Sequence, residues 1–432
     1  MNSPMLNHGL RCFWLALMGS LGAAISVSAQ TGAVSPVHDP TVIQTDSGFY
    51  LYSTGTGIPS FHSTNLYDWQ ASGRVFTQIP AWIFQELPAF KGGHLWAPDI
   101  SYHNGLYLLY YCASIFGKND SCIALAVNKS LDPASPAYRW EDRGLILKSR
   151  RGQDNWNAID PQGITDESGR RWLVFGSYWS GIQMTALNPD TGKPLRQPPE
   201  LIHLASRKDS TAIEAPFIVR QGGFYYLFVS FDQCCKGIES TYHLLVGRSP
   251  AITGPYVDFT GKPMLQGGAT LVLDSYGSVH GPGHNSVVQS SGRHWLVHHF
   301  YDGNNQGART LQIRPLYWLR NGWPVAGEPI EGPLTPLPAK PATSVAGIWD
   351  FSVNFAPAQR LELQPQGKAL AETKPGSWSL NGNWLTLRWP DAAAPQGAWV
   401  DECVLAPNGQ YFVGRNQSGV VIRATVSARR AK

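Results

Sequence analysis

The sequence predicts an all-β protein: a five-bladed β-propeller followed by a small C-terminal antiparallel β-barrel or sandwich domain. Composition is the first observation, because 44 Gly, 32 Pro and 12% aromatic residues are typical of a turn-rich β protein with ample core-forming side chains. The second is a repeated hairpin pattern: a short strand, a polar turn with Gly, and a strand rich in aromatic and β-branched residues. This pattern begins five times, at His38, Trp96, Ile159, Glu214 and Gly283. Repeats of roughly 55 to 70 residues can each supply four strands, which predicts blades around a central channel.

Residues 1–29 are predicted to be a secretory signal peptide. A short region ending in Arg11 precedes an apolar run from Cys12, and Val27-Ser28-Ala29 has the small residues of a cleavage site. The run is shorter than the roughly 20 apolar residues that a membrane-spanning helix needs, and no later segment is long and apolar enough. We therefore expect a secreted or periplasmic protein that does not associate with a membrane once the signal is removed.

The propeller is predicted to span 34–338 and the C-terminal accessory β domain 344–432. Between them the proline-rich stretch Pro333 to Pro341 fits a stiff linker. The longest helical candidate, Ile79 to Glu86, is interpreted as part of a loop insertion. The C-terminal domain could be a sugar-binding module, or its tryptophans could be core residues of a domain that braces the propeller, which is the usual fate of Trp in β domains. The residues concerned are Trp349, Trp378 and Trp384.

Charge and cysteine usage add two expectations. The net charge of +4 is small and the basic residues are scattered apart from a short C-terminal tail, Arg429 to Lys432, so nothing favours nucleic-acid binding. Cys112 and Cys122 flank a turn-like stretch and could be bridged across adjacent strands in an oxidising compartment. The adjacent Cys234 and Cys235 could form a vicinal disulfide. Five cysteines remain after signal removal, so at least one thiol should stay free.

Three acids and a histidine fall about 11 or 12 residues before the second strand's aromatic, at one equivalent position of the repeat. They are Asp39, Asp160, Glu214 and His284, and the second repeat offers Trp96 there. Residues at one blade position converge on one place around the channel. Acids, an imidazole and an aromatic face together suit a sugar, because the aromatic covers C–H surface while the carboxyl groups handle hydroxyls and bond cleavage.

Cleavage of a glycosidic bond requires one protonated and one ionised carboxyl group. Asp39 follows His38 in an open polar turn and should stay ionised, as a base must. Glu214 has apolar neighbours, and partial burial beside another carboxylate should raise its pKa, as an acid needs. Asp160 is then available to hold Glu214 in position and keep it protonated. His284 could be a metal ligand, a substrate contact or a core residue, and an imidazole with waters suits Ca²⁺ only loosely because calcium prefers oxygen.

The motifs VHDP, LWAPD, NAIDPQG, EAP, FDQCCKG and GPGHNS, in this order along the propeller, resemble glycoside hydrolase family 43 and, within it, the endo-α-1,5-L-arabinanases. The resemblance implies a five-bladed propeller and a secreted enzyme that hydrolyses arabinan with inversion at the anomeric carbon. It implies that Asp39 is the general base, Glu214 the general acid, and Asp160 the carboxylate that tunes and orients the acid. It also implies that His284 approaches a calcium ion in the channel.

The same resemblance implies a set of substrate contacts, and we expect a monomer. The substrate-binding positions are Trp96, Phe116, Gly117, Asn157, Ala158, Ile159, Ser177, Tyr178 and Trp179. An exo-acting α-L-arabinofuranosidase or β-xylosidase on the same fold is the first alternative, and a non-catalytic carbohydrate-binding propeller is the second. A sucrose- or fructan-processing propeller also needs three carboxylates, but the motifs around these acids differ. The Cys-Cys pair and the GPGH segment favour an arabinanase.

Overall fold

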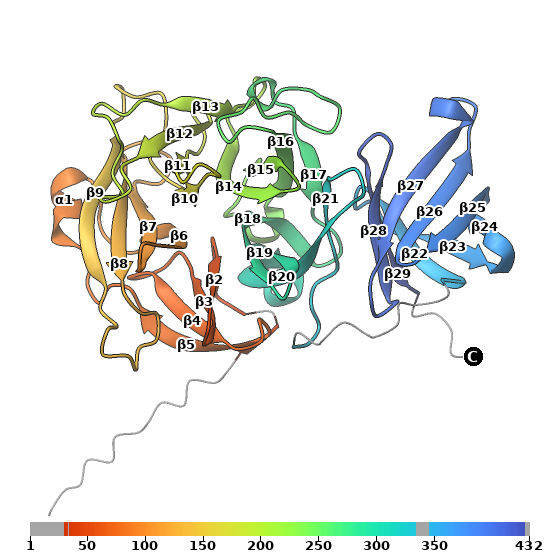
Figure 1. Cartoon of the computed structure of the whole chain (residues 1–432), viewed down its shortest axis with the longest axis horizontal. Helices are drawn as coiled ribbons and strands as arrows, with labels where there is room; N and C mark the ends of the chain where they lie inside the picture. The colour runs from red at the N-terminus through yellow and green to blue at the C-terminus, as the bar shows by residue number, and fades with distance from the viewer. Residues whose placement is uncertain (1–29, 33, 334–344, 428–432) are drawn as a thin grey trace, which may run out of the picture.

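The computed structural model describes residues 30–32, 34–333 and 345–427. Five antiparallel sheets surround a central axis, and a closed barrel lies beside them (Figure 1). The predicted five-bladed propeller with a C-terminal β domain is therefore confirmed, and the domain is a barrel. The predicted signal peptide, most of the proline-rich linker and the basic C-terminal tail lie outside the described residues.

Each blade is one antiparallel sheet whose strands follow in chain order from the channel outward, and β1 is added at the outer edge of the first blade. Blade 1 contains β1 (Gln30–Thr31), β2 (Thr41–Thr45), β3 (Gly48–Tyr52), β4 (Pro59–Ser63) and β5 (Asp68–Arg74). Blade 2 contains β6 (Trp96–His103), β7 (Leu106–Ser114), β8 (Ser121–Asn128) and β9 (Glu141–Ser149). Blade 3 contains β10 (Gln162–Thr165), β11 (Arg171–Phe175), β12 (Ile182–Leu187) and β13 (Ile202–Ala205).

The last two blades have the same arrangement. Blade 4 contains β14 (Ile213–Gln221), β15 (Phe224–Phe231), β16 (His243–Ser249) and β17 (Thr270–Leu273). Blade 5 contains β18 (Val279–Ser290), β19 (Arg293–Asp302), β20 (Ala308–Trp318) and β21 (Pro324–Ala326). The predicted helical candidate contains the short helix α1 (Ala81–Glu86), which lies in the connection between blades 1 and 2.

The inner hairpins of three blades turn on two residues that both have positive φ, which is the backbone twist a tight antiparallel hairpin requires. The turn residues are Asn104-Gly105, Gly222-Gly223 and Ser291-Gly292. The ring is closed by backbone hydrogen bonds between the N-terminal segment and β20. Val37 N donates to Arg309 O at 3.0 Å and Leu311 N to Val34 O at 2.8 Å. The first and last blades are thereby held together.

Apolar cores lie between neighbouring blades, because each sheet buries both faces. In blade 2, Cys122 packs with Ala113 on the face toward blade 1, whereas Cys112 packs with Ile123 on the face toward blade 3. Both cysteines are free and buried. The possible Cys112–Cys122 disulfide is therefore wrong: Cys112 pairs with Ile123 and Ala113 with Cys122, so the two thiols project to opposite faces.

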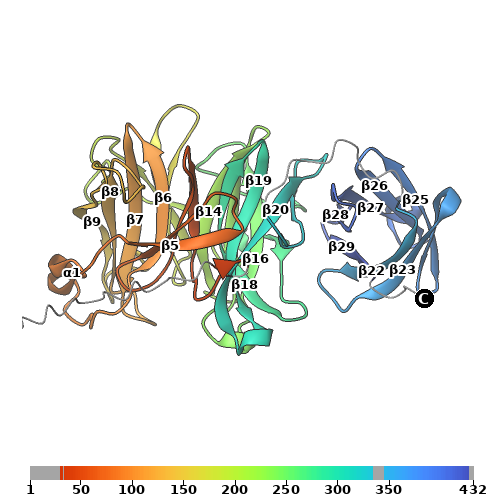
Figure 2. The same cartoon turned by 90° about the horizontal axis from the view of Figure 1, so that it is seen from below.

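The C-terminal domain is a closed barrel that packs beside β20 and β21 (Figure 2). Its strands are β22 (Gly347–Val353), β23 (Gln359–Gln364), β24 (Lys368–Ala371), β25 (Lys374–Asn381), β26 (Trp384–Pro390), β27 (Ala398–Leu405), β28 (Tyr411–Asn416) and β29 (Val421–Val426). The buried Arg415 guanidinium donates across the interface to Pro324 O and Leu271 O. Trp349 lies in the barrel core, Trp378 packs against it, and Trp384 lies under Arg320 of the propeller, which agrees with a bracing domain. No helix among the described residues is long and apolar enough to cross a membrane.

Candidate active site

Each of the five inner strands has, within it or two residues before its start, a residue in the left-handed backbone region, which non-glycine residues rarely adopt. These residues are Asp39 (φ 50°), Ala97 (φ 42°), Asp160 (φ 55°), Ala215 (φ 56°) and His284 (φ 49°). Each lies two residues before an inner-strand residue that pairs with the second strand, as in the pairs Thr41 with Tyr52 and Phe217 with Phe228. Proline follows in four blades and Asn285 in the fifth. The structural repeat is thus defined by a local backbone distortion at the channel.

This geometry corrects the predicted alignment by one residue in two blades. Asp39, Asp160 and His284 are equivalent, as expected, but Glu214 and Trp96 lie one position earlier, equivalent to His38, Ile159 and Gly283. The sequence spacing of 11 or 12 residues concealed this offset. In blade 5 the earlier position must be glycine, because a Cβ on Gly283 would come 2.4 Å from the Tyr242 ring. Two successive positions of the repeat therefore supply the site.

Asp39 is a buried carboxylate with partners on both oxygens. Thr54 Oγ1 accepts from Ala97 N at 2.8 Å and donates to Asp39 Oδ2 at 2.6 Å. His38 Nδ1 lies 3.0 Å from Oδ2 and His284 Nδ1 lies 3.1 Å from Oδ1. Burial acts to raise the pKa of Asp39, but the two histidines hold that pKa well below its usual range. Asp39 therefore stays ionised.

The pKa values of Asp160 and Glu214 are shifted in the opposite direction, upward. Ala215 N donates to Asp160 Oδ2 at 3.1 Å, which holds Asp160 against the backbone that follows Glu214, and Ser177 Oγ donates to Glu214 Oε2 at 2.7 Å. Burial raises the pKa of both carboxyl groups, that of Asp160 to about 8, and the charge of Glu214 contributes to the increase at Asp160. The pair consequently retains a proton in the neutral range. One region of the channel thus holds an ionised carboxylate and a second region a carboxylic acid.

His284 lies in contact with Asp39, which the sequence did not predict. Burial lowers the pKa of this imidazole, but the adjacent Asp39 charge and hydrogen bond outweigh that effect and raise it to about 9.

Three further residues around Asp39 were missed: Thr54, His299 and Tyr301. Asp39 N donates to His299 Nδ1 at 3.2 Å, and burial lowers the pKa of His299 well below its usual value, so this imidazole is neutral. The sequence did contain a signal for two of them, because residues 299 and 301 alternate onto one face of β19, and His299 pairs with Gly283, the residue before His284.

The expected substrate-binding residues fall into two groups by exposure. Phe116 is 79% exposed, Trp179 is 37% exposed, and Trp96, Tyr178 and Gly117 keep part of their surface open. The others are buried: Asn157, Ala158, Ile159 and Ser177. Asn157 Oδ1 accepts from Ser121 Oγ and Ala158 N donates to Ser149 Oγ, so these two residues fix the backbone before Asp160. Ala158, with no exposed surface, offers none to a ligand.

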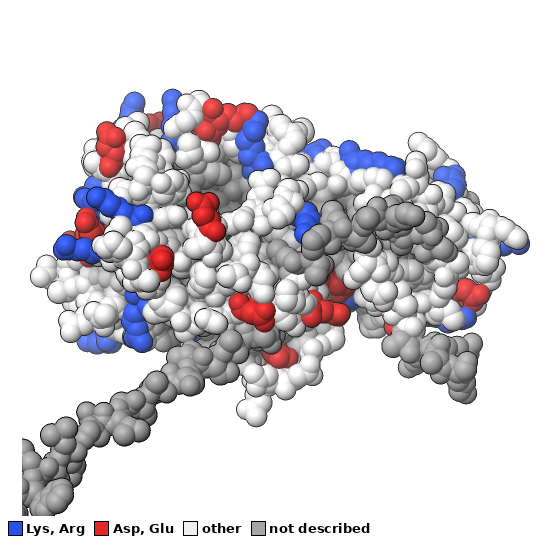
Figure 3. Space-filling model, turned by 60° about the horizontal axis from the view of Figure 1, so that its bottom comes forward, with Lys and Arg blue, Asp and Glu red and all other residues white. Residues whose placement is uncertain are grey.

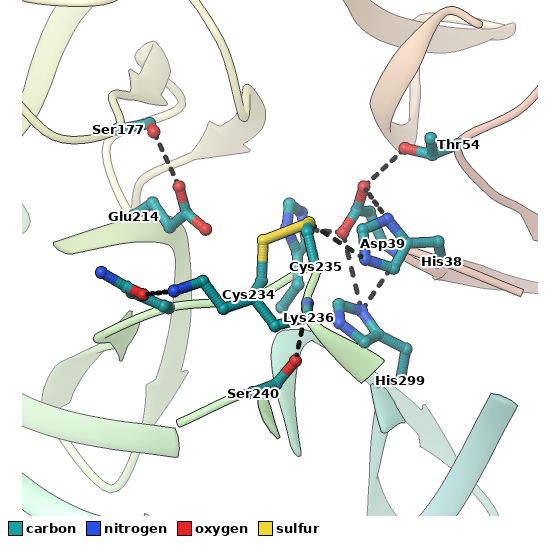
Figure 4. The surroundings of a disulfide bond; sticks show 12 residues. His38, Asp39, Thr54, Ser177, Glu214, Cys234, Cys235, Lys236, Ser240 and His299 are labelled. Carbon is teal, nitrogen blue, oxygen red and sulfur yellow. Dashed lines mark hydrogen bonds and ion pairs between the residues drawn. A yellow bond between two sulfur atoms is a disulfide. The ribbon is translucent and has the colours of Figure 1, made fainter. Parts of the chain in front are cut away.

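The predicted vicinal disulfide is present between Cys234 and Cys235, in the connection that follows β15. In the view of Figure 4 it lies between Glu214 and the cluster around Asp39.

Elsewhere on the surface, acidic and basic side chains are interspersed over the face shown in Figure 3.

Known proteins are similar in sequence to this propeller. The model of the glycosyl hydrolases family 43 matches residues 34–324, which is nearly all of the propeller. The chain belongs to this family. It is 43% identical over 325 residues, 73% of this chain and 92% of that protein, to the extracellular exo-α-(1→5)-L-arabinofuranosidase ArbA of Cellvibrio japonicus. It is 41% identical over 308 residues, 70% of this chain and 91% of that protein, to the extracellular endo-α-(1→5)-L-arabinanase 1 of Bacillus subtilis.

A solved structure of this family has the same propeller. The α-L-arabinanase of Cellvibrio cellulosa, in complex with arabinohexaose, is similar with a TM-score of 0.65 and 44% identity, covering 67% of this chain and 95% of that one. Family membership and the site identify the chain as a glycoside hydrolase, which confirms the expected enzyme class. Both curated relatives are extracellular enzymes, which confirms the expectation of a secreted protein.

Proposed function

We propose that this family 43 enzyme hydrolyses α-1,5-linked L-arabinofuranosyl bonds of arabinan with inversion, with Asp39 as general base and Glu214 as general acid. The observation that carries the proposal is the opposite electrostatics of two buried carboxyl sites in one channel: Asp39 is kept ionised by His38 and His284, while Asp160 and Glu214 share a proton. Inverting hydrolysis needs this pair of protonation states at once.

The proposed reaction transfers two protons. Asp39 accepts a proton from water while the water oxygen forms a bond to the anomeric carbon, and Glu214 donates its proton to the departing glycosidic oxygen. Afterwards Asp39 is protonated and Glu214 is ionised, and exchange with solvent restores both. Thr54, held by Ala97 N, keeps Asp39 Oδ2 oriented, and Ser177 does the same for Glu214 Oε2. A non-catalytic binder has no need of these unequal protonation states.

We propose internal cleavage, as in the relative from Bacillus subtilis, and the exo-acting relative from Cellvibrio japonicus supports end-directed cleavage as the second candidate. Product analysis over time on linear and branched arabinan distinguishes them. Mixed oligomers in the first minutes are expected for internal cleavage. A single short product from the outset would instead assign end-directed action, and turnover of xylan oligomers alone would assign a β-xylosidase.

Asp160→Asn should move the alkaline limb of the rate profile to lower pH. The two carboxyl groups interact, as the effect of the Glu214 charge on the pKa of Asp160 shows, and the interaction is mutual. When Glu214 holds the shared proton, the negative charge of Asp160 therefore opposes ionisation of the acid. Without that charge the pKa of Glu214 falls, so the acid loses its proton, and the enzyme its activity, at lower pH than in the wild type. The profile of kcat against pH between about 5 and 9 measures this. An unchanged profile with an unchanged maximum rate would show that Asp160 does no more than cap the turn.

We propose a hydrated Ca²⁺ beside His284 in the channel. Among the described residues both polar atoms of the buried Asn285 amide, in the residue after His284, lack a protein partner, so water must accept from Nδ2 and water or a cation must pair with Oδ1. Asp39, Asp160 and Glu214 supply the oxygen-rich, negative surroundings that calcium prefers. His284 Nδ1 faces Asp39, which leaves Nε2 and bound waters to hold the ion, and binding of the ion at Nε2 requires that this nitrogen release its proton. The ion would supply positive charge that favours ionised carboxylates and orders waters.

Chelation should reduce activity and lower the melting temperature without unfolding the protein, and added Ca²⁺ should reverse both effects. His284→Ala should show a similar loss and no response to calcium. Thermal melts of the wild type and variant with chelator and with calcium test this. If chelation shifts neither the melting temperature nor the rate of the wild type, the calcium proposal is wrong and His284 acts on Asp39 alone.

A further inference from the structure

The Cys234–Cys235 disulfide lies against the side of the channel that holds Asp39 (Figure 4). Its connection joins β15 to β16 through a short 3₁₀ turn, Gly237–Glu239, and is closed by Thr241 N donating to Gln233 O at 3.0 Å. Cys235 Sγ is 4.0 Å from His38 Nε2. The disulfide therefore contacts a residue that itself contacts Asp39.

A chain of hydrogen bonds leads from the disulfide to that carboxylate. Cys235 N donates to Tyr301 Oη at 2.7 Å. Tyr301 Oη lies 3.0 Å from His38 Nε2, and His38 Nδ1 lies 3.0 Å from Asp39 Oδ2. Tyr301 is on β19 of blade 5 and His38 leads into β2 of blade 1, so three blades contribute to one continuous chain.

The proton positions in this chain follow from which atoms can donate. A backbone N–H only donates, so the Tyr301 oxygen accepts from Cys235 and its own proton remains for another partner. An ionised carboxylate only accepts, so His38 Nδ1 carries the proton that faces Asp39. An imidazole that carries its proton on Nδ1 alone accepts at Nε2, and in that tautomer Nε2 accepts the hydrogen bond of the Tyr301 hydroxyl. Each group has one role, and the roles fix both the tautomer and the ring orientation of His38.

We propose that the Cys234–Cys235 disulfide and Tyr301 are positioning elements that act through His38 on Asp39, an inference that rests on the proposed role of Asp39 as base. The bond joins consecutive residues in a small ring and so restricts the backbone at Cys235, where φ is 68°, a left-handed value that is uncommon for this residue type. The direction of the Cys235 N–H depends on that conformation. Without the bond, this N–H can turn away from Tyr301, and His38 loses one of its two fixed partners.

Reduction can test the proposal selectively. Cys112, Cys122 and Cys403 are free and buried, so Cys234–Cys235 is the one disulfide among the described residues. A water-soluble phosphine supplies two electrons to the S–S bond, two protons come from water, and the phosphine takes up the water oxygen. The products are two thiols and a phosphine oxide.

The experiment compares four forms of the full-length enzyme on linear arabinan: wild type, the double variant Cys234→Ser/Cys235→Ser, Tyr301→Phe, and the triple combination. We expect kcat to fall roughly tenfold in each variant with KM within about twofold, since one positioning hydrogen bond is lost. The triple variant should be no slower than Tyr301→Phe, because both changes interrupt one chain. Tyr317→Phe is the matched control: it removes a hydroxyl bonded to Tyr411 at the barrel interface and should leave kcat unchanged.

Two further measurements test the chain of hydrogen bonds itself. Reductant should slow the wild type by the same factor as the serine variant and leave that variant unaffected, which also covers the case of a serine variant that folds poorly. Nitrogen-15 NMR of wild-type His38 should show a proton on Nδ1. Effects that add in the triple variant, full wild-type activity after thiol counting confirms reduction, or a His38 ring with its proton on Nε2 and none on Nδ1 would each overturn the proposal. If Asp39→Asn itself stays active, the proposed function fails; if it is inactive while the disulfide changes are neutral, only this inference fails.

Discussion

Asp39→Asn should lower kcat on arabinan by about 10²- to 10⁴-fold, because loss of a general base removes a contribution of that size. The amide keeps the shape of the side chain and can still accept from Thr54, but it cannot take a proton from water. Initial rates with saturating arabinan measure the loss, and a thermal melt checks that the variant is folded.

Asp99→Asn is the matched control for this change. Asp99 is a buried aspartate on β6, and its Oδ2 accepts from Gly163 N at 2.9 Å, an interaction that an amide oxygen can keep. This variant also removes a buried carboxyl group from an inner strand, but Asp99 interacts with Gly163 and Arg171 and not with Asp39 or Glu214, so the variant should retain near-normal activity. Near-normal activity of Asp39→Asn as well would rule out its role as base.

Glu214→Gln should also lose about 10²- to 10⁴-fold on arabinan, but the loss should depend on the leaving group. In an aryl arabinooligosaccharide with an acidic phenol, the phenolate leaves without being protonated, so hydrolysis of this substrate does not need the acid. We expect the variant to recover most of its rate on such a substrate, while Asp39→Asn stays slow on both because its water is not activated. Equal losses for Glu214→Gln on both substrates would contradict the assignment of Glu214 as acid.

The fold could be predicted because each blade repeats its own local signals. Alternating apolar residues and Gly-containing turns such as Asn104-Gly105 define hairpins without reference to distant parts of the chain. Predicting the face of the sheet to which a side chain points also requires the register between the paired strands. Cys112 and Cys122 flank a turn, yet a pairing of Cys112 with Ile123 sends their thiols to opposite faces. A one-residue difference in register reverses that outcome, and turn length was not evident from the sequence.

For the candidate site, the sequence predicted the residues but not their environment. Asp39, Asp160 and His284 could be recognised because they occupy one repeat position. Glu214 is offset by one residue, since the left-handed conformation at Ala215 is a backbone property that spacing does not reveal. The contact of Asp39 with His299 depends on how blades 1 and 5 close the ring, and the Thr54 hydroxyl is oriented toward Asp39 by Ala97 N of blade 2. Such contacts come from tertiary structure, and no local pattern encodes them.

The stereochemistry of the first product tests the central claim most directly. Proton NMR of linear arabinan, recorded immediately after addition of enough enzyme to outpace mutarotation, resolves the anomeric signals of the newly formed reducing end. If Asp39 activates water on the face opposite to the bond that Glu214 protonates, the α-linked substrate must give the β-anomer first, and the α-anomer should appear only later as the two equilibrate. The α-anomer as first product would show retention through a covalent intermediate, and the assignment of Asp39 as base and Glu214 as acid of an inverting hydrolysis would then be wrong.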